Sequence, residues 1–231
     1  MIIAIDGPAG AGKSTVAKIL AKKLGFLYID TGAMYRALTL KTLESSTDIE
    51  NTQAIIDLAR KSLIGLSNNS DGSLKILLDG EDVSKEIREP RITKFVSDIA
   101  KIKGVRMVML ELQRKLGKEK NSVLDGRDIG TVVFPDADKK FYIDAIPKER
   151  VNRRYKELRG ALQNITLEDV EIDLNNRDKI DSTREFAPLK KAKDAIYVDT
   201  TNLSIDEVVE RLLSYIIKSK HKYGQNINSQ F

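Results

Sequence analysis

The sequence predicts an α/β fold in which a parallel β-sheet is flanked by helices. Short apolar runs of strand length alternate with longer amphipathic stretches along most of the chain, and this alternation is typical of parallel βαβ units. Hydrophobic residues make up 41% of the 231 residues, which is enough apolar material for one α/β domain with insertions. We therefore expect a single core sheet with helices on its faces.

Five short, mainly apolar segments are the expected strands of the core sheet. The first is wholly apolar and predicts a buried strand, and the others lie between amphipathic stretches, where the strands of βαβ units belong. In order, the expected strands are residues 2–5, 26–29, 122–124, 140–143 and 196–198.

The expected helices are marked by apolar residues at helical spacing and by start and stop signals. Gly25 ends the first helix, Asp30-Thr31-Gly32 begins the second, Pro90 precedes the next pair, and the capping box Ser204-Ile205-Asp206-Glu207 opens the last. The helices before that last one are expected over residues 14–24, 33–43, 92–101, 105–116, 148–162 and 167–181.

Residues 64–82 differ from the rest in having strand-like alternation around turn residues. Asn68-Asn69-Ser70-Asp71-Gly72 lies between two alternating segments, and Asp79-Gly80 follows. Such turns join antiparallel strands, so we expect a small antiparallel hairpin inserted between helical regions. Residues 223–231 are polar and aperiodic, and we expect a frayed tail there.

Composition excludes several kinds of site. The chain has no cysteine and one histidine, His221, which rules out a disulfide framework, a thiolate or multi-histidine metal site, and a Ser-His-Asp triad. No apolar run approaches the ~20 residues of a membrane span. Asp6 follows the first residues too early for a signal peptide, so a reducing cytoplasm is the expected location.

The net charge of +5 has two interpretations. Lysine-rich helix faces, as around Lys18, Lys22 and Lys23, are commonly just solvated. Alternatively the chain binds anions, either small phosphates or nucleic acid. The positions of the arginines distinguish these interpretations better than the total charge does.

Residues 7–14, Gly7-Pro8-Ala9-Gly10-Ala11-Gly12-Lys13-Ser14, match the P-loop pattern G-x-x-x-x-G-K-[ST] at every fixed position. The glycines let backbone N–H groups turn inward to form an anion site, and the following helix adds its positive N-terminal dipole. Lys13 is expected to reach the β- and γ-phosphates of ATP and the Ser14 hydroxyl to ligate Mg²⁺. A chance glycine-rich turn is the alternative, but a predicted strand precedes the motif and a predicted helix follows it.

Other sequence features narrow the class of P-loop protein. The chain lacks the Asn-Lys-x-Asp signature of guanine-specific switches. Its candidate second acidic motif, Val123-Leu124-Asp125-Gly126, ends in one carboxylate instead of the Asp-Glu pair of helicase-type ATPases. The residues that could hold an acceptor must therefore decide the function.

Two arginine-containing segments follow predicted strands, where ligands gather in open α/β folds. Asp30 to Arg36 places an arginine one turn into a helix, where it can clamp a phosphate. Asp125-Gly126-Arg127-Asp128-Ile129-Gly130 suits a loop that closely approaches a ligand. The simpler interpretations are a packing tyrosine beside a surface arginine in the first segment and an Arg–Asp salt bridge in a tight turn in the second.

Two predicted helices carry the remaining arginines. Arg150, Arg153 and Arg154 crowd within one turn, and three guanidinium groups repel unless an anion joins them, although Glu149 and Glu157 partly supply a solvated alternative. The second helix carries Arg177, Asp181 and Arg184, which a continuing helix would present on one side. A weak i,i+4 ion pair is the alternative there.

Together these motifs resemble the bacterial cytidylate kinases, a branch of the nucleoside monophosphate kinases. The resemblance covers the chain from Ile2 to about Ile217. The matching stretches are GPAGAGKST at Gly7, DTGAMYRAL at Asp30, DVSKEIR at Asp82, LDGRDIGTVVFPDA at Leu124, RDKIDSTR at Arg177 and APL at Ala187.

The resemblance implies a P-loop NTPase fold with a central five-stranded parallel sheet and two mobile parts. The core would comprise residues 1–30, 86–147 and 185–219. An insertion that binds the nucleoside monophosphate (NMP) and contains the small antiparallel sheet would span residues 31–85. A helical lid would span residues 148–184, and a flexible tail residues 220–231.

The resemblance also implies roles for individual residues. ATP would lie on Gly7, Pro8, Ala9, Gly10, Ala11, Gly12, Lys13, Ser14 and Thr15, with Mg²⁺ at Ser14. Ser97, Arg106 and Asp128 would read cytosine, and Arg36 and Arg127 would hold the CMP phosphate. The acceptor site would also include Thr31 and Tyr35, with Arg177, Asp181 and Arg184 around the sugar and phosphates, and Lys13, Arg153 and Arg154 would be the catalytic residues.

The expected activity is therefore ATP-dependent phosphorylation of CMP, and of dCMP, by a cytoplasmic monomer without nucleic-acid or membrane partners. Three alternatives remain open at this point. The first is a P-loop kinase for another small acceptor, such as UMP, AMP or a non-nucleotide metabolite. The second is a basic, nucleotide-dependent RNA-binding module, although no aromatic-rich stacking platform is evident in the sequence. The third is a P-loop regulatory switch, although the sequence lacks a guanine motif and a recognisable effector segment.

Overall fold

The structure, a computed structural model, describes residues 1–68, 74–160 and 165–224, with side chains to residue 217. Residues 69–72 of the predicted hairpin turn, the end of the helix predicted to 162 and most of the predicted tail lie outside the described residues. None of the described helices combines the length and the hydrophobicity that a membrane crossing requires.

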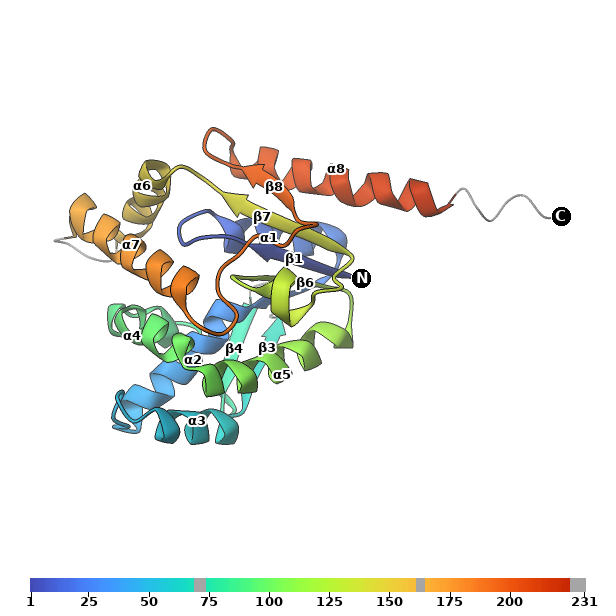
Figure 1. The fold of residues 1–231 in the computed structure, drawn as a ribbon. Helices are drawn as coiled ribbons and strands as arrows, with labels where there is room; N and C mark the ends of the chain where they lie inside the picture. The colour runs from blue at the N-terminus through green and yellow to red at the C-terminus, as the bar shows by residue number, and fades with distance from the viewer. Residues whose placement is uncertain (69–73, 161–164, 225–231) are drawn as a thin grey trace.

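A five-stranded parallel sheet forms the centre of the molecule, as predicted, with strand order β2-β6-β1-β7-β8 (Figure 1). The strands are β1 (Ile2–Asp6), β2 (Leu27–Asp30), β6 (Ser122–Gly126), β7 (Lys139–Asp144) and β8 (Ile196–Asp199). The register pairs Asp30 with Asp125 and Asp6 with Gly126. Three carboxylates therefore gather where neighbouring strands end.

Helices cover both faces of the sheet. On one face, β1, β6, β7 and β8 share a hydrophobic cluster with helices α1 (Lys13–Leu24) and α8 (Ile205–Gly224). Alternate residues of β1, β2 and β6 face the other way and join a second cluster with α2 (Thr31–Glu44), α4 (Pro90–Lys101) and α5 (Lys103–Glu119). This alternation is the pleat of a sheet buried on both sides.

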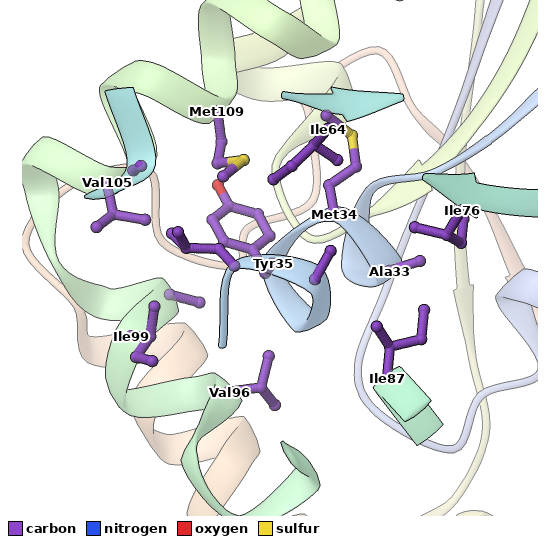
Figure 2. Close-up of a cluster of buried hydrophobic side chains, with 14 of the residues drawn as sticks. Ala33, Met34, Tyr35, Ile64, Ile76, Ile87, Val96, Ile99, Val105 and Met109 are labelled. Carbon is purple, nitrogen blue, oxygen red and sulfur yellow. The ribbon is translucent and has the colours of Figure 1, made fainter. Parts of the chain in front are cut away.

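The predicted hairpin is a three-stranded antiparallel sheet of β3 (Ile64–Asn68), β4 (Leu74–Leu78) and β5 (Glu81–Asp82). It packs through Ile64 and Ile76 against Met34 of α2, in the cluster drawn in Figure 2. A helix, α3 (Thr52–Lys61), precedes it and was not predicted from the sequence.

Helices α6 (Pro147–Leu158) and α7 (Leu167–Thr183) form the segment that the sequence analysis assigned to a lid. In Figure 1, α7 lies between α6 and α4, and it contacts both. A small hydrophobic cluster joins α6 and α7 to Ala9 of the P-loop. Two short elements complete the chain: the 3₁₀ helix Glu86–Arg88 and the π-helix Ile129–Val133, labelled η1 and η2.

Candidate active site

The P-loop connects β1 to α1 and is shaped by close backbone contacts. Gly7 has φ 147° and approaches β7 so closely that an added Cβ would lie 1.9 Å from the carbonyl oxygen of Ile143. The helix begins at Lys13 and has no acidic residue in its first turn. Its free N–H groups and dipole therefore present an uncompensated positive end, which suits a phosphate.

Lys13 is buried at 5% relative exposure, and its ammonium group donates to the Pro8 carbonyl oxygen at 2.5 Å. Burial and the nearby Arg127 cation lower the pKa of Lys13 to about 7, against the opposing effect of Asp125. A phosphate beside the ammonium group would favour its charged form. The position therefore suits a cation that works with an anionic ligand.

Ser14 lies next to a buried carboxylate. Its hydroxyl donates to Asp125 Oδ2 at 2.7 Å, and the Tyr28 hydroxyl donates to Asp125 Oδ1 at 2.8 Å. Burial and the neighbouring carboxylate of Asp30 raise the pKa of Asp125 to about 7. The Thr31 hydroxyl donates to the Asp125 carbonyl oxygen at 2.7 Å, so the start of α2 is fixed to the end of β6.

This oxygen-rich corner suits Mg²⁺ bound together with ATP phosphates. Ser14 is exposed, and its hydroxyl oxygen is a hard ligand of the type that Mg²⁺ prefers. Within the described ranges, no group of three or more His, Cys, Asp and Glu residues is placed to hold a metal ion by itself. The residues present fit a metal ion that takes most of its ligands from phosphates and water.

Asp6, the last residue of β1, holds the loop that follows β6. Its two carboxylate oxygens accept the N–H groups of Ile129 (2.8 Å) and Gly130 (2.7 Å), at the start of the π-helix η2. Burial and the Asp128 carboxylate raise the pKa of Asp6 to about 6. The residue that precedes the P-loop therefore also positions Asp128.

Asp128 is the centre of a buried charge network. The guanidinium group of Arg106, from α5, donates to Asp128 Oδ2 at 2.6 Å, and that of Arg184 lies 3.6 Å from Asp128 Oδ1. Arg106 also lies over the ring of Tyr35, 5.3 Å from its centroid. Tyr35 itself is buried in the cluster of Figure 2. The two arginines thus flank one carboxylate and an aromatic ring.

Two guanidinium nitrogens of this network are buried without a hydrogen-bond partner: Arg106 Nε, and Arg184 Nη2, which lies 3.6 Å from Asp128 Oδ1. Arg154 Nε, on α6, is a third such nitrogen, and Gln113 of α5 lies beside Tyr35. A buried donor left unpaired costs about 1–3 kcal/mol. Because most buried polar groups in proteins are paired, these donors indicate a place for a ligand that offers acceptor atoms.

Asp181 connects this network to Arg127. It accepts from Arg127 Nε at 2.8 Å and from Arg184 at 2.9 Å. Burial raises the pKa of Asp181, but the two guanidinium groups outweigh it and hold the value below the ordinary range. The prediction that Arg184 continues the helix is wrong, because α7 ends at Thr183 and Arg184 has extended backbone angles. Arg184 reaches Asp181 from the loop that follows α7.

Arg36, Arg154 and Arg177 form a group of neighbouring cations, and Arg177 also lies near Arg127 and Asp181 of this network. Burial and the nearby cations of Arg177 and Arg154 together lower the pKa of Arg36 to about 10. Burial also lowers the pKa of Arg177, and the nearby cations of Arg127 and Arg154 lower it as well. Arg36 donates to the Thr93 hydroxyl at 2.9 Å. Mutually repelling guanidinium groups in one place are characteristic of a site for a multiply charged anion.

The three arginines of α6 do not form one cluster, contrary to the sequence-based interpretation. Arg150 binds the P-loop and Asp178. Arg153 donates to Glu149 and, through the other guanidinium nitrogens, to the Thr200 hydroxyl and carbonyl after β8. Arg154 pairs with Glu157 at 2.8 Å and lies with the cations around Arg36. A helix separates its side chains around the axis, so closeness in sequence does not bring them together.

Of the other predicted residues, Thr15 is exposed after Ser14, and Ser97 is half-buried on α4, the helix that contacts α7. Sequence reasoning did not assign Asp6, Tyr28, Gln113 or Asp178 to the site. Asp6 carried a usable signal, since it is a carboxylate at the end of the first predicted strand. Tyr28, Gln113 and Asp178 belong to the site only through contacts with residues distant in sequence, so no local sequence signal marks them.

Comparisons with known proteins agree with this geometry. The family model for cytidylate kinase matches residues 3–218. The cytidylate kinase of Clostridioides difficile (strain 630) is 55% identical over 216 residues, which cover 94% of this chain and 98% of that protein. The cytidylate kinase of Caldanaerobacter subterraneus subsp. tengcongensis is 52% identical over 217 residues, 94% of this chain and 95% of that protein.

Among solved structures, an uncharacterised protein from Eubacterium ventriosum has a TM-score of 0.51 at 14% identity and covers 94% of this chain and 98% of its own. A gluconokinase from Sinorhizobium meliloti has a TM-score of 0.50 at 11% identity, with coverage of 97% and 96%. At these identities the likeness shows a shared fold only.

Proposed function

Because this chain belongs to the cytidylate kinase family, we propose that it transfers the γ-phosphoryl group of ATP to CMP, giving CDP and ADP, and that dCMP is a second acceptor. The observation that carries the proposal is the buried network of Arg106, Asp128 and Arg184, with its unpaired donors, next to a P-loop. ATP and Mg²⁺ are the donor and its metal ion.

The chemistry of cytosine fits this network. Cytosine offers an N4 amino donor beside the N3 and O2 acceptors. Asp128 can accept from N4 while Arg106, whose Nε is unpaired, donates to N3 or O2. Uracil presents a carbonyl oxygen and an N3–H at the same positions, so both contacts would be mismatched. Buried mismatches of this kind reject a ligand strongly. Ser97 is the third residue we assign to the base.

The neighbouring cations would hold the phosphates. Arg36 and Arg127 would bind the CMP phosphate, with Arg177, Asp181 and Arg184 around the sugar. Thr31 and Tyr35 belong to the same region, since Thr31 fixes the start of α2 and Tyr35 lies against Arg106. Together they would orient the acceptor oxygen toward the γ-phosphorus.

Phosphoryl transfer requires mainly alignment and neutralisation of charge. Lys13 and the P-loop backbone would hold the ATP phosphates, and Arg154 would stabilise charge on the group in transfer. Ser14 would hold Mg²⁺ together with the ATP phosphates, and the ion would supply positive charge that offsets theirs. A general base is unnecessary if the CMP phosphate attacks as its dianion. Arg153, which donates to Thr200 after β8, is proposed to assist Arg154 on the group in transfer.

The segments 31–85 and 148–184 are proposed to be the NMP-binding insertion and the lid, and residues 220–231 a flexible tail. The arginines of the site come from both proposed segments and from the core, which supports a closing motion that assembles it. We further propose a cytoplasmic monomer that acts on small nucleotides.

The test is a set of initial rates with CMP, dCMP, UMP and AMP at a fixed concentration of Mg-ATP. We expect the highest kcat/KM for CMP, with dCMP next and AMP lowest. A preference for UMP or AMP would reassign the acceptor. If no acceptor stimulates ADP release while RNA binds in a steeply salt-dependent way, the nucleic-acid alternative would replace the kinase.

A further inference from the structure

Ala9 of the P-loop is the point at which α6 and α7 contact the donor site. Its N–H donates to Asp178 Oδ1 on α7 at 3.1 Å, and its carbonyl oxygen accepts from the Arg150 guanidinium group on α6 at 3.0 Å. Arg150 and Asp178 also pair directly with each other. Both backbone hydrogen-bonding groups of one P-loop residue are therefore used to hold two later helices.

The same contact has an apolar side. The Ala9 side chain is 5% exposed and belongs to a cluster with Val151 of α6 and with Val170 and Leu174 of α7. This cluster is the hydrophobic core of the α6–α7 pair. Because a P-loop residue completes it, the loop and the two helices pack as one unit at this point.

Arg150 is fixed by further contacts. Its Nε donates to the Ala145 carbonyl oxygen at 3.2 Å, and the residue is 8% exposed. The backbone of the P-loop also comes close to it, since a Cβ added at Gly10 would lie 2.9 Å from the Arg150 carbonyl oxygen. Arg150 is thus engaged by the protein itself, unlike Arg154, which has an unpaired buried nitrogen.

We propose that Asp178 and Arg150 are positioning residues that couple the P-loop to α7 and so keep the acceptor-side residues in register with ATP. Asp178 follows Arg177 directly and lies one turn before Asp181 on the same helix. Fixing Asp178 to Ala9 therefore fixes the two residues that we assign to the sugar and phosphates. This inference rests on the proposed function for the identity of the acceptor.

The first test is the variant Asp178→Asn. The amide oxygen can still accept the Ala9 N–H, but the carboxylate charge on α7 that pairs with Arg150 is lost, and Asp144, 3.8 Å from Arg150 Nε, is left to balance that arginine. We expect kcat with CMP to fall about tenfold or more, since small displacements of positioning groups are costly. We also expect more than one ADP to be released per CDP formed, because a loosened α7 would admit water to the γ-phosphate. The control is Glu171→Gln, which also replaces a carboxylate by an amide, but at an exposed position of α7.

The ratio of ADP to CDP separates positioning from simple stabilisation. If the pair only stabilises the fold, Asp178→Asn would lower the melting temperature and the amount of active enzyme but leave the ratio at one, and the proposal would be overturned. Should this variant unfold in the assay, Asp178→Glu replaces it. That variant keeps the charge but lengthens the side chain, and it should also raise the ratio.

A double-mutant cycle adds Arg150→Met, alone and combined with Asp178→Asn. Coupled residues should give a double variant whose loss in kcat is at least fivefold smaller than the product of the two single losses. The control for the arginine change is Lys156→Met, at an exposed position of α6. Losses that simply multiply would contradict the coupling.

Hydrogen–deuterium exchange of the full chain with a non-hydrolysable ATP analogue tests the coupling without an acceptor. Binding at the P-loop should slow exchange in peptides of α7 in the unaltered protein and in Glu171→Gln, but not in Asp178→Asn. Protection without CMP phosphorylation would leave the coupling intact and reject the proposed acceptor. Equal protection in Asp178→Asn would reject the coupling.

Discussion

The donor and acceptor sides of the site are built in different ways. The donor side is made from one contiguous loop, residues 7–14, whose backbone and helix N-terminus form the anion site. The acceptor side is made from side chains of α2, α5, α7 and the loop after β6, joined by ion pairs such as the buried Arg106–Asp128 and the partly buried Arg127–Asp181. One side depends on main-chain shape and the other on balanced charge.

This difference has consequences for specificity. A backbone site recognises any phosphate chain, because N–H groups and a helix dipole carry no information about a base. Paired side chains can recognise a base, because each donor or acceptor left unmatched in a buried site is costly. Damage to the donor side should therefore abolish turnover for every acceptor, whereas damage to the acceptor side should change which acceptor is used.

The largest effect is expected from Lys13→Ala on the donor side. Removing a buried cation from the ATP phosphates should lower kcat on the order of a thousandfold, by analogy with other charge clamps in enclosed sites. The loss should be equal for CMP and dCMP. Coupled assays of both acceptors measure it, with the exposed Lys18→Ala on the same helix as control. Near-normal rates would remove the P-loop lysine from the mechanism.

Arg154→Ala tests the boundary between the two sides. Since Arg154 lies with Arg36 and Arg177, we expect a loss of about a hundredfold in kcat with little change in either KM, as for a group that acts on the transition state. Arg153→Ala is the comparison, because Arg153 is bound to the loop after β8. Steady-state kinetics with both substrates varied would measure the loss of kcat in Arg154→Ala. A change in KM alone would contradict a role of Arg154 in the transition state.

The two sides also differ in how far the sequence could predict them. The P-loop, the five strands and the antiparallel hairpin were predicted because their signals are local: a fixed motif, short apolar runs and turn residues. Helix α3 was missed, although Asn51 caps it by accepting the Ala54 N–H at 3.0 Å. Its start signal lies in a polar stretch, residues 44–53, whose composition is typical of a loop.

On the acceptor side the residue types could be predicted but their partners could not. Arg150, Arg153 and Arg154 are adjacent in sequence, yet each contacts a different part of the molecule. Asp6 and Gly130 are hydrogen-bonded although they lie 124 residues apart. Such a pairing can be predicted only when the register of β1 and β6 is known. Charge networks of this kind form through tertiary packing, so no local sequence pattern predicts which residues will pair.

Asp128→Asn tests the acceptor side directly. An asparagine amide can donate to the O4 of uracil, which the carboxylate cannot do. We expect the preference for CMP over UMP, as a ratio of kcat/KM values, to fall about tenfold or more. Because both acceptors are measured in one preparation, loss of folded protein from the unbalanced arginines cancels in the ratio. An unchanged ratio would show that the base is read elsewhere.

The smallest effect on turnover is expected at Asp6, which links the two sides. In Asp6→Asn one of the two backbone N–H groups would face an amide NH₂ instead of an oxygen. The loop would keep its other bond, so we expect a loss of only a few-fold in kcat/KM for CMP. A loss as large as that of Lys13→Ala would mean that Asp6 does more than hold the loop.

The pH dependence of unfolding gives a sharper measurement of Asp6. Its pKa is about 6 in the folded protein against 3.8 as the ordinary value, so between these values the folded state binds more protons than the unfolded state. The contribution of Asp6 to the free energy of unfolding should therefore fall as pH rises from about 4 to 6 and level off above that, by about 3 kcal/mol at about 1.4 kcal/mol per pKa unit. Asp125, whose pKa is raised to about 7, adds a loss of the same sign that extends to higher pH.

Urea unfolding across this range should show that loss in the unaltered protein and in the exposed-site control Asp136→Asn, but a smaller one in Asp6→Asn. Stability is the better readout here, because the second pKa of a phosphate monoester, near 6, would confound rates in the same window. If Asp6→Asn leaves the pH dependence unchanged, Asp6 does not carry a buried charge. If the free energy of unfolding of Asp6→Asn depends less on pH, the ionised Asp6 carboxylate destabilises the folded protein at neutral pH. Its two hydrogen bonds nevertheless hold the loop after β6 to β1, the strand that leads into the P-loop.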